Sequence, residues 1–329
     1  MSFLNSIQSQ NQSKLFPENE EIDNRISVYI ITGFLGAGKT TLLNSTLKQF
    51  PDDNNIVIEN EVGEVNIDKS LVKGNFKKVF EITNGCLCCN LDTELYNALD
   101  HITQMKTQPH NLFIETTGIA DAGNLSAIFR EEFVKKIFNL RKIICVVDVE
   151  VIEDFLGHAP ECARQIAASD LIVLNKVNRI SPDYLAEVEP MVKKINPWAQ
   201  FVQTPAGSIT KNYLTMKNPA RPAFILNKEN EKTTGHTVNS VLFETDSPFN
   251  MEKLQFLLQS SLFVYYREIY RIKGYVKDRK ENTYLVQTAG KTLDISKTTE
   301  QIEKSHLVFI GPGLTLKTAQ GLLYAALQE

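Results

Sequence analysis

The first two thirds of the chain alternate short apolar runs with segments in which apolar residues recur at helical spacing. The runs predict strands over 28–31, 56–59, 79–82, 112–115, 143–148, 171–175 and 201–204. Segments 40–50 and 92–105 lie between them and have the spacing of amphipathic helices. Strands that alternate with helices are typical of an α/β fold, in which a doubly wound, mostly parallel sheet has helices on both faces.

The pattern changes after a polar, charged stretch without periodicity. Beyond it, strands are predicted over 238–244, 268–276, 284–288 and 307–310, and helices over 251–262 and 316–327. This mixture indicates a smaller α+β domain. The sequence therefore predicts a polar N-terminal tail over 1–25, a nucleotide-binding domain over 26–226, a linker over 227–236 and the α+β domain over 237–329.

Composition narrows the classes of partner. The 329 residues carry a net charge of −4, so no basic surplus favours nucleic acid as a partner. The longest apolar runs are far too short to cross a bilayer, and the polar start of the chain lacks a secretory signal. Three of the five cysteines lie within four positions, which indicates a reducing compartment such as the cytoplasm and metal or thiol chemistry.

A phosphate-binding motif follows the first predicted strand. Residues 33–40 fit G-x-x-x-x-G-K-[ST] at every position, with a strand before them and a helix after them. Glycines at Gly33, Gly36 and Gly38 let backbone N–H groups converge on an anion at the helix N-terminus. Lys39 is expected to reach the β- and γ-phosphates, and the Thr40 hydroxyl to bind Mg²⁺. This context argues against a chance glycine-rich turn.

A second acidic element follows the strand 112–115. At the end of that strand, Glu115 is expected to point into the Mg²⁺ shell, and Gly118 could offer its N–H to the γ-phosphate. Taken alone, the segment could equally be an ordinary strand-to-loop turn. The phosphate loop favours the functional interpretation.

The segment after strand 171–175 resembles the loop that reads the base in GTPases. There Asn175 would contact the purine and Lys176 would pack over its ring. Asn178 occupies the position of an Asp that accepts hydrogen bonds from guanine. Because charge-assisted hydrogen bonds are roughly twice as strong as neutral ones, guanine affinity should fall. A nucleoside triphosphate is thus better supported than GTP itself, and a plain polar loop is the alternative.

A cysteine cluster follows the strand 79–82. Thiols at Cys86, Cys88 and Cys89 suit a soft or borderline metal such as Zn²⁺, Cu⁺ or Co²⁺. The acidic segment 59–64 lies after another strand at the same sheet edge and could supply further ligands. Structural zinc sites have four protein ligands in paired spacing, so this pattern favours an exchangeable site. The alternative interpretations of the cluster are buried free thiols or a redox pair. The other two cysteines, Cys145 and Cys162, are expected to be structural core residues.

Taken together, these motifs resemble the CobW-like family of P-loop GTPases, which includes zinc metallochaperones. The resemblance runs from about residue 28 to the C-terminus. It rests on the following segments: 33–41, 58–64 with 67–68, 86–89, 115–118, 165–176, 270–275 and 307–311. The Cys-x-Cys-Cys element beside a phosphate loop is its most specific part.

The resemblance implies GTP hydrolysis with Mg²⁺, a nucleotide site that includes Thr41, and a metal site that binds Zn²⁺ or Co²⁺. The ligands it implies are Cys86, Cys88 and Cys89, with Glu59 or Glu64. It also implies that the nucleotide state controls metal delivery to a client metalloprotein, as movable switch loops allow. Candidate catalytic residues are Lys39 and Glu115, and a homo-oligomer is left open.

Two departures from the family pattern stand out. Asn178 replaces the family's Asp, and the region between the domains holds only His236 where many members are rich in histidine. Two other functions compatible with the phosphate loop are a small-molecule kinase of cofactor metabolism and a nucleotide-dependent metal- or redox-sensing module. The kinase would give the cysteines no role, and the sensor would show negligible turnover.

Overall fold

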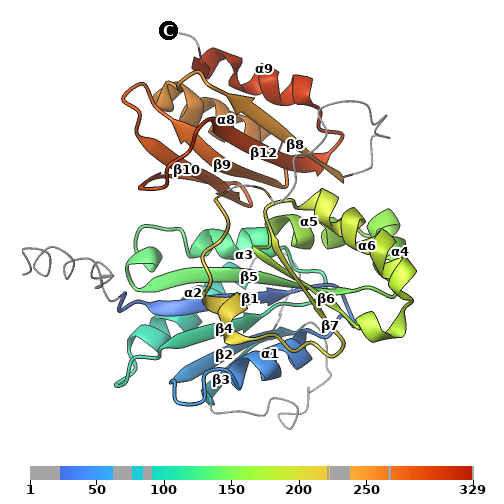
Figure 1. Ribbon diagram of the computed structural model, residues 1–329. Helices are drawn as coiled ribbons and strands as arrows, with labels where there is room; N and C mark the ends of the chain where they lie inside the picture. The colour runs from blue at the N-terminus through green and yellow to red at the C-terminus, as the bar shows by residue number, and fades with distance from the viewer. Residues whose placement is uncertain are drawn as a thin grey trace, which may run out of the picture.

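The computed structural model describes residues 23–61, 76–83, 91–220, 222, 238–265 and 268–327. Two layered units are stacked on each other (Figure 1). Within the described residues, no helix is long and apolar enough to cross a membrane. The linker predicted over 227–236 lies outside the described residues.

The larger unit contains a seven-stranded sheet in the order β3-β2-β4-β1-β5-β6-β7. Each of its pairings is parallel, which confirms the predicted α/β class. All seven predicted strands are present, and β5 begins five residues before the predicted start. The strands are β1 (Ile26–Thr32), β2 (Asn55–Glu61), β3 (Phe76–Thr83), β4 (Asn111–Glu115), β5 (Phe138–Asp148), β6 (Leu171–Asn175) and β7 (Gln200–Thr204).

Helices cover both faces of this sheet, as predicted. One face packs against α1 (Lys39–Leu47) and α7 (Lys211–Thr215). The other face packs against α2 (Leu91–Thr103), α3 (Ala122–Ile128), α5 (Pro160–Ala168) and α6 (Pro182–Ile195), with α4 (Ile152–His158) at its end. The predicted helix over 40–50 ends earlier, at Leu47, in a turn that precedes Pro51.

The smaller unit is a five-stranded antiparallel sheet in the order β11-β10-β9-β12-β8. Its outer face is covered by α8 (Met251–Tyr265) and α9 (Leu316–Leu327) (Figure 1). The edge strand β11 was not predicted, because only two of its seven residues, Leu293 and Ile295, are apolar and none is fully buried. The strands are β8 (Val238–Thr245), β9 (Arg271–Lys277), β10 (Thr283–Ala289), β11 (Thr292–Thr298) and β12 (Ser305–Pro312).

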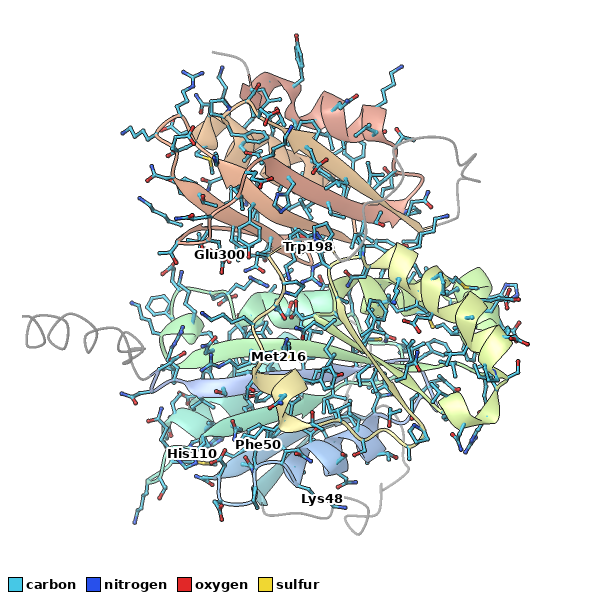
Figure 2. All side chains as sticks on the ribbon, in the orientation of Figure 1. Lys48, Phe50, His110, Trp198, Met216 and Glu300 are labelled. Atoms are coloured by element: carbon cyan, nitrogen blue, oxygen red, sulfur yellow. The ribbon has the colours of Figure 1, made fainter. Side chains whose placement is uncertain are left out.

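The inner face of the second sheet packs on the first unit. Trp198, which precedes β7, is 1% exposed and lies where the two units meet (Figure 2). Its ring stacks on His306 of β12, with the ring centroids 5.7 Å apart. The surrounding apolar cluster draws residues from both units, so the two sheets share one continuous core here.

A buried ionic cluster lies in the same interface. Arg271 of β9 donates from Nη2 to Oδ1 of Asp170 at 2.9 Å, and the Nζ of Lys273 lies 3.4 Å from the same oxygen. The other carboxylate oxygen of Asp170 accepts from the backbone N–H of Ile143 at 3.2 Å. Two cations therefore share one carboxylate, and all three side chains are buried.

The surplus charge should cost stability. Burial lowers the pKa of Lys273 to about 8, although the charge of Asp170 acts in the opposite direction. An unfolded lysine keeps its proton to about pH 10. Between these values the unfolded chain binds more protons than the folded protein, so stability rises with pH.

We therefore expect Lys273→Met to raise the free energy of unfolding by about 1–3 kcal/mol at pH 7, because Arg271 continues to pair with Asp170. Urea unfolding at pH 7 and pH 10 measures the effect, and the gain should shrink at pH 10. A variant that is less stable than the wild type at pH 7 would mean that Lys273 stabilises the cluster.

Candidate functional site

The phosphate loop lies between β1 and α1, at the carboxyl edge of the parallel sheet. Gly38 has a φ of +104°, and a Cβ added there would lie 2.6 Å from Nδ2 of Asn175. A Cβ on Gly33 would lie 2.3 Å from the carbonyl oxygen of Val146. Only glycine fits these two positions, because the backbone of β5 and the side chain of Asn175 approach them directly. Gly36 also has a positive φ, of +73°.

The side chains that end the loop have different partners. The Nζ of Lys39 donates to the carbonyl oxygen of Phe34 at 3.2 Å, so the ammonium group lies over the loop. Thr40 donates from Oγ1 to Oε1 of Glu115 at 2.7 Å. Thr41 is exposed on the first turn of α1. Residues separated by 75 positions in the sequence, Thr40 and Glu115, thus meet as the phosphate-loop interpretation expected.

The Thr40–Glu115 pair suits a hard divalent cation. Glu115 is 8% exposed at the end of β4, and it brings a carboxylate oxygen to a hydroxyl beside the phosphate loop. Mg²⁺ prefers oxygen ligands of this kind together with substrate phosphates. These residues therefore fit the Mg²⁺ ion that nucleotide binding requires, and their roles as its ligands stay a prediction.

Glutamate residues are paired in the register of three adjacent strands. In the register of the sheet, Glu115 of β4 pairs with Glu59 of β2, and Glu59 pairs with Glu81 of β3. The sequence singled out Glu59 and missed Glu81, whose alignment becomes visible only when the strands are paired. The other predicted metal ligands lie outside the described residues; they are Glu64, Cys86, Cys88 and Cys89. Among the residues that the structure describes, no group of three or more His, Cys, Asp or Glu could hold a metal.

The loop after β4 lies directly against the phosphate loop. A Cβ on Gly118 would lie 2.7 Å from the backbone nitrogen of Leu35, so the two loops are in contact. The Nε2 atom of Gln165 on α5 donates to the carbonyl oxygens of Gly118 and Ala120, at 3.0 and 3.2 Å. The next residue, Asp121, caps α3. This arrangement holds Gly118 beside the region where the γ-phosphate is expected.

The predicted base-reading loop is braced by Asn175. Its Nδ2 donates to the carbonyl oxygen of Ala37 at 2.8 Å, and its Oδ1 accepts from the backbone N–H groups of Lys176 and Gly207. Asn175 is 3% exposed, so it joins three loops around the nucleotide site. The sequence predicted a base contact and missed this bracing role; the base contact stays a prediction.

After Asn175, the side chain of Lys176 is paired with an acidic residue, whereas Asn178 is exposed. Lys176 has a φ of +64°, and its ammonium group forms an ion pair with Asp148 at the end of β5. The exposed Asn178 lies in the short 3₁₀ turn η2 (Val177–Arg179). Asp148 was missed from the sequence, although an acidic residue at the carboxyl end of a buried strand is the signal that identified Glu115.

The two described cysteines are core residues, as expected. Cys145 and Cys162 are each 2% exposed. Burial raises the pKa of Cys162 to about 12, so its thiol stays protonated at neutral pH. Thiolates are the nucleophiles and metal ligands among cysteine species. Neither residue therefore competes with the 86–89 cluster for this chemistry.

Comparisons with known proteins agree on the family. The family model described as the CobW/HypB/UreG nucleotide-binding domain matches residues 27–203, and that of the cobalamin synthesis protein cobW C-terminal domain matches 238–327. The chain is 30% identical over 270 residues to the zinc chaperone YjiA of Escherichia coli, covering 76% of this chain and 81% of YjiA.

Two further similarities extend this result. Zinc-regulated GTPase metalloprotein activator 1 of Schizosaccharomyces pombe is 33% identical over 214 residues, which are 63% of this chain and 52% of that protein. The crystal structure of Zn(II)-bound YjiA GTPase from E. coli superposes with a TM-score of 0.67 at 24% identity. It covers 93% of this chain and all of that one, so the whole two-unit fold is shared.

Proposed function

Because this chain belongs to the CobW/HypB/UreG family and carries the cobW C-terminal domain, we propose that it is a GTP-hydrolysing metallochaperone. In this proposal it binds zinc at an exchangeable site and delivers it to a client metalloprotein. The names of the relatives, zinc chaperone and zinc-regulated GTPase metalloprotein activator, support both parts. The single observation that carries the proposal is the aligned pair Glu115 and Glu59, on neighbouring strands at the phosphate-loop edge.

The nucleotide half of the proposal assigns roles to described residues. Backbone N–H groups of the phosphate loop and the charge of Lys39 would hold the β- and γ-phosphates. Thr40 and Glu115 would hold Mg²⁺, which neutralises charge on the phosphate oxygens. Gly118 would offer its N–H to the γ-phosphate. Loss of the γ-phosphate would therefore remove contacts made by the loops that follow β1 and β4.

The metal half assigns zinc to the cysteine cluster as cargo. Cys86, Cys88 and Cys89 would bind it as thiolates, with Glu59 or Glu64 completing the set. Glu59 belongs to β2, the strand hydrogen-bonded to β4, whose last residue is Glu115. In this proposal, a change at the Mg²⁺ site would reach Glu59 through the pairing of β4 with β2. Hydrolysis would in this way alter zinc affinity.

Replacing one cluster thiol tests the metal half. Cys88→Ala should weaken zinc binding at least tenfold, because it removes one of only three thiolates, while GTP affinity stays within about twofold of wild type. Competition with a chromophoric zinc chelator measures the first quantity and nucleotide titration the second. Cys162→Ala, a buried thiol outside the cluster, is the matched control. Unchanged zinc affinity in Cys88→Ala would contradict the proposed site.

Asn178 gives a separate test of base recognition. We expect Asn178→Asp to raise GTP affinity about tenfold or more, because a carboxylate accepts charge-assisted hydrogen bonds from the guanine ring N–H and amino group. ATP affinity should not rise, since adenine offers no such pair of donors at that edge. Titration with both nucleotides checks the result. An equal gain for ATP and GTP would mean that position 178 does not read the base.

A further inference from the structure

Gln165 is a buried polar residue on α5 that the nucleotide site does not use directly. It is 1% exposed, and its Nε2 atom donates to two carbonyl oxygens of the loop between β4 and α3, those of Gly118 and Ala120. Because both partners are acceptors, the amide nitrogen is the atom that must face them. The side chain therefore restrains a segment more than 40 positions away in the sequence.

The restrained segment is the one expected to sense the γ-phosphate. Glycine has the least restricted backbone of any residue, so Gly118 needs an outside contact to keep one conformation. One side of it is closed by Leu35 of the phosphate loop, which leaves no room even for a Cβ. On the other side, Gln165 holds its carbonyl group. These two contacts fix the orientation of the peptide groups around Gly118.

The same helix ends in the interface with the C-terminal unit. Two to four residues after Gln165, the carbonyl oxygens of Ala167 and Ser169 accept from Nη1 of Arg271, at 2.9 and 2.8 Å. Arg271 is 3% exposed and belongs to β9. A cation that binds the last carbonyl groups of a helix also complements the negative end of its dipole.

The short helix α5 thus contacts the loop that contains Gly118 through Gln165, and it contacts the C-terminal sheet through its last carbonyl groups. We propose that Gln165 is a positioning residue for Gly118, and that α5 carries the position of this loop to the C-terminal unit through Arg271. The inference rests on the proposed GTPase function, since the loop must respond to the γ-phosphate. It adds a route by which nucleotide state reaches the second sheet.

The physical basis is that Gln165 and the carbonyl groups bound by Arg271 lie within about one helical turn. A displacement of the loop that pulls Gln165 therefore shifts the acceptors of Arg271 without bending a long element. Coupling of this kind is reciprocal: if the γ-phosphate changes the interface, the interface changes the affinity for GTP by the same factor.

The test compares Gln165→Met with wild type in the full-length protein. Methionine keeps the length and helix propensity of glutamine but cannot donate to a carbonyl oxygen. The matched control is Asn111→Leu, because Nδ2 of the buried Asn111 also makes two donations, to Asp53 and Asn55, at the opposite edge of the sheet. Affinities for GDP and a non-hydrolysable GTP analogue are measured by fluorescence titration, and amide hydrogen exchange is followed across β9.

We expect Gln165→Met to weaken binding of the GTP analogue about fivefold or more, with GDP affinity within twofold. In the wild type, exchange at 271–277 should differ between the two nucleotides, and Gln165→Met should remove this difference. Asn111→Leu should change neither result. Unchanged analogue affinity in Gln165→Met would overturn the positioning role, and a persistent exchange difference would overturn the route through α5.

A second variant tests the route with the loop contact intact. Arg271→Lys keeps a positive charge beside Asp170, but a single ammonium group cannot reproduce the fork that reaches Asp170 and both carbonyl oxygens. The nucleotide-dependent exchange difference should fall by at least half, and a difference equal to that of wild type would overturn the proposal. If the wild-type protein bound neither nucleotide, the proposed function would fail instead, and the two failures are distinguishable.

Discussion

Replacing Lys39 with alanine should reduce GTP turnover by at least about 10²-fold, because it removes the one side-chain cation of the phosphate loop. In the structure its ammonium group lies over the loop, 3.2 Å from the carbonyl oxygen of Phe34. Charge that develops on the phosphate oxygens during hydrolysis would lose the stabilising charge of this ammonium group. The effect should be larger on kcat than on nucleotide affinity, because the backbone N–H groups of the loop remain.

Phosphate release under saturating GTP and Mg²⁺ measures this effect. Lys48→Ala is the matched control, since the exposed Lys48 directly follows the same helix (Figure 2). Its turnover should equal that of the wild type. Turnover of Lys39→Ala within threefold of wild type would contradict the assignment of this loop as the hydrolytic site.

Replacing Asp170 with asparagine should lower the free energy of unfolding by about 3–5 kcal/mol at pH 7, because breaking a buried ion pair leaves the partner charges uncompensated. Arg271 and Lys273 are 3% and 4% exposed, so water cannot replace the lost carboxylate. Urea unfolding measures the change. Asp246→Asn, which breaks the exposed pair with Lys304, is the control and should have little effect.

The ionisation of Asp170 should also make the free energy of unfolding depend on pH. Burial alone would raise the pKa of Asp170, but the charges of Lys273 and Arg271 and the hydrogen bond from Ile143 hold it well below its usual range. A depressed pKa stabilises the fold above the pKa of about 3.9 in the unfolded chain, and this contribution is lost as pH falls towards the folded value. Wild type should therefore lose stability below about pH 4 more steeply than Asp170→Asn. If the stabilities of wild type and Asp170→Asn fell equally steeply below about pH 4, the ion pairing of Asp170 would be contradicted.

The sequence predicted those parts of the site that depend on local order along the chain. The phosphate loop needs a strand, a glycine-rich turn and a helix in succession, and these can be recognised from 28–50 alone. Likewise, the seven parallel strands are short apolar runs bounded by polar residues, which the sheet order confirms. Glu115 could be selected because an acidic residue at the end of a buried strand reaches the edge where parallel strands meet.

Contacts between distant segments could not be predicted in this way. Gln165 reads as one polar residue on a helix, and its two acceptors become visible only when the β4–α3 loop lies beside α5. Arg271 and Asp170 are separated by 101 positions and belong to different units of the fold. The edge strand β11 carries only two apolar residues, Leu293 and Ile295, and none of its residues is fully buried. These features were missed for the same reason: they depend on which distant residues pair, and no periodicity in the sequence encodes that pairing.

We propose that nucleotide state and zinc affinity are coupled, and a metal titration tests this coupling directly. Purified metal-free protein is titrated with Zn²⁺, and with Co²⁺ as a spectroscopic probe of thiolate ligation. The titrations are made with a non-hydrolysable GTP analogue, with GDP and without nucleotide. We expect metal affinities that differ at least fivefold between the GTP analogue and GDP. Equal affinity in all three states would contradict it, because a metal that binds two states equally cannot shift the balance between them.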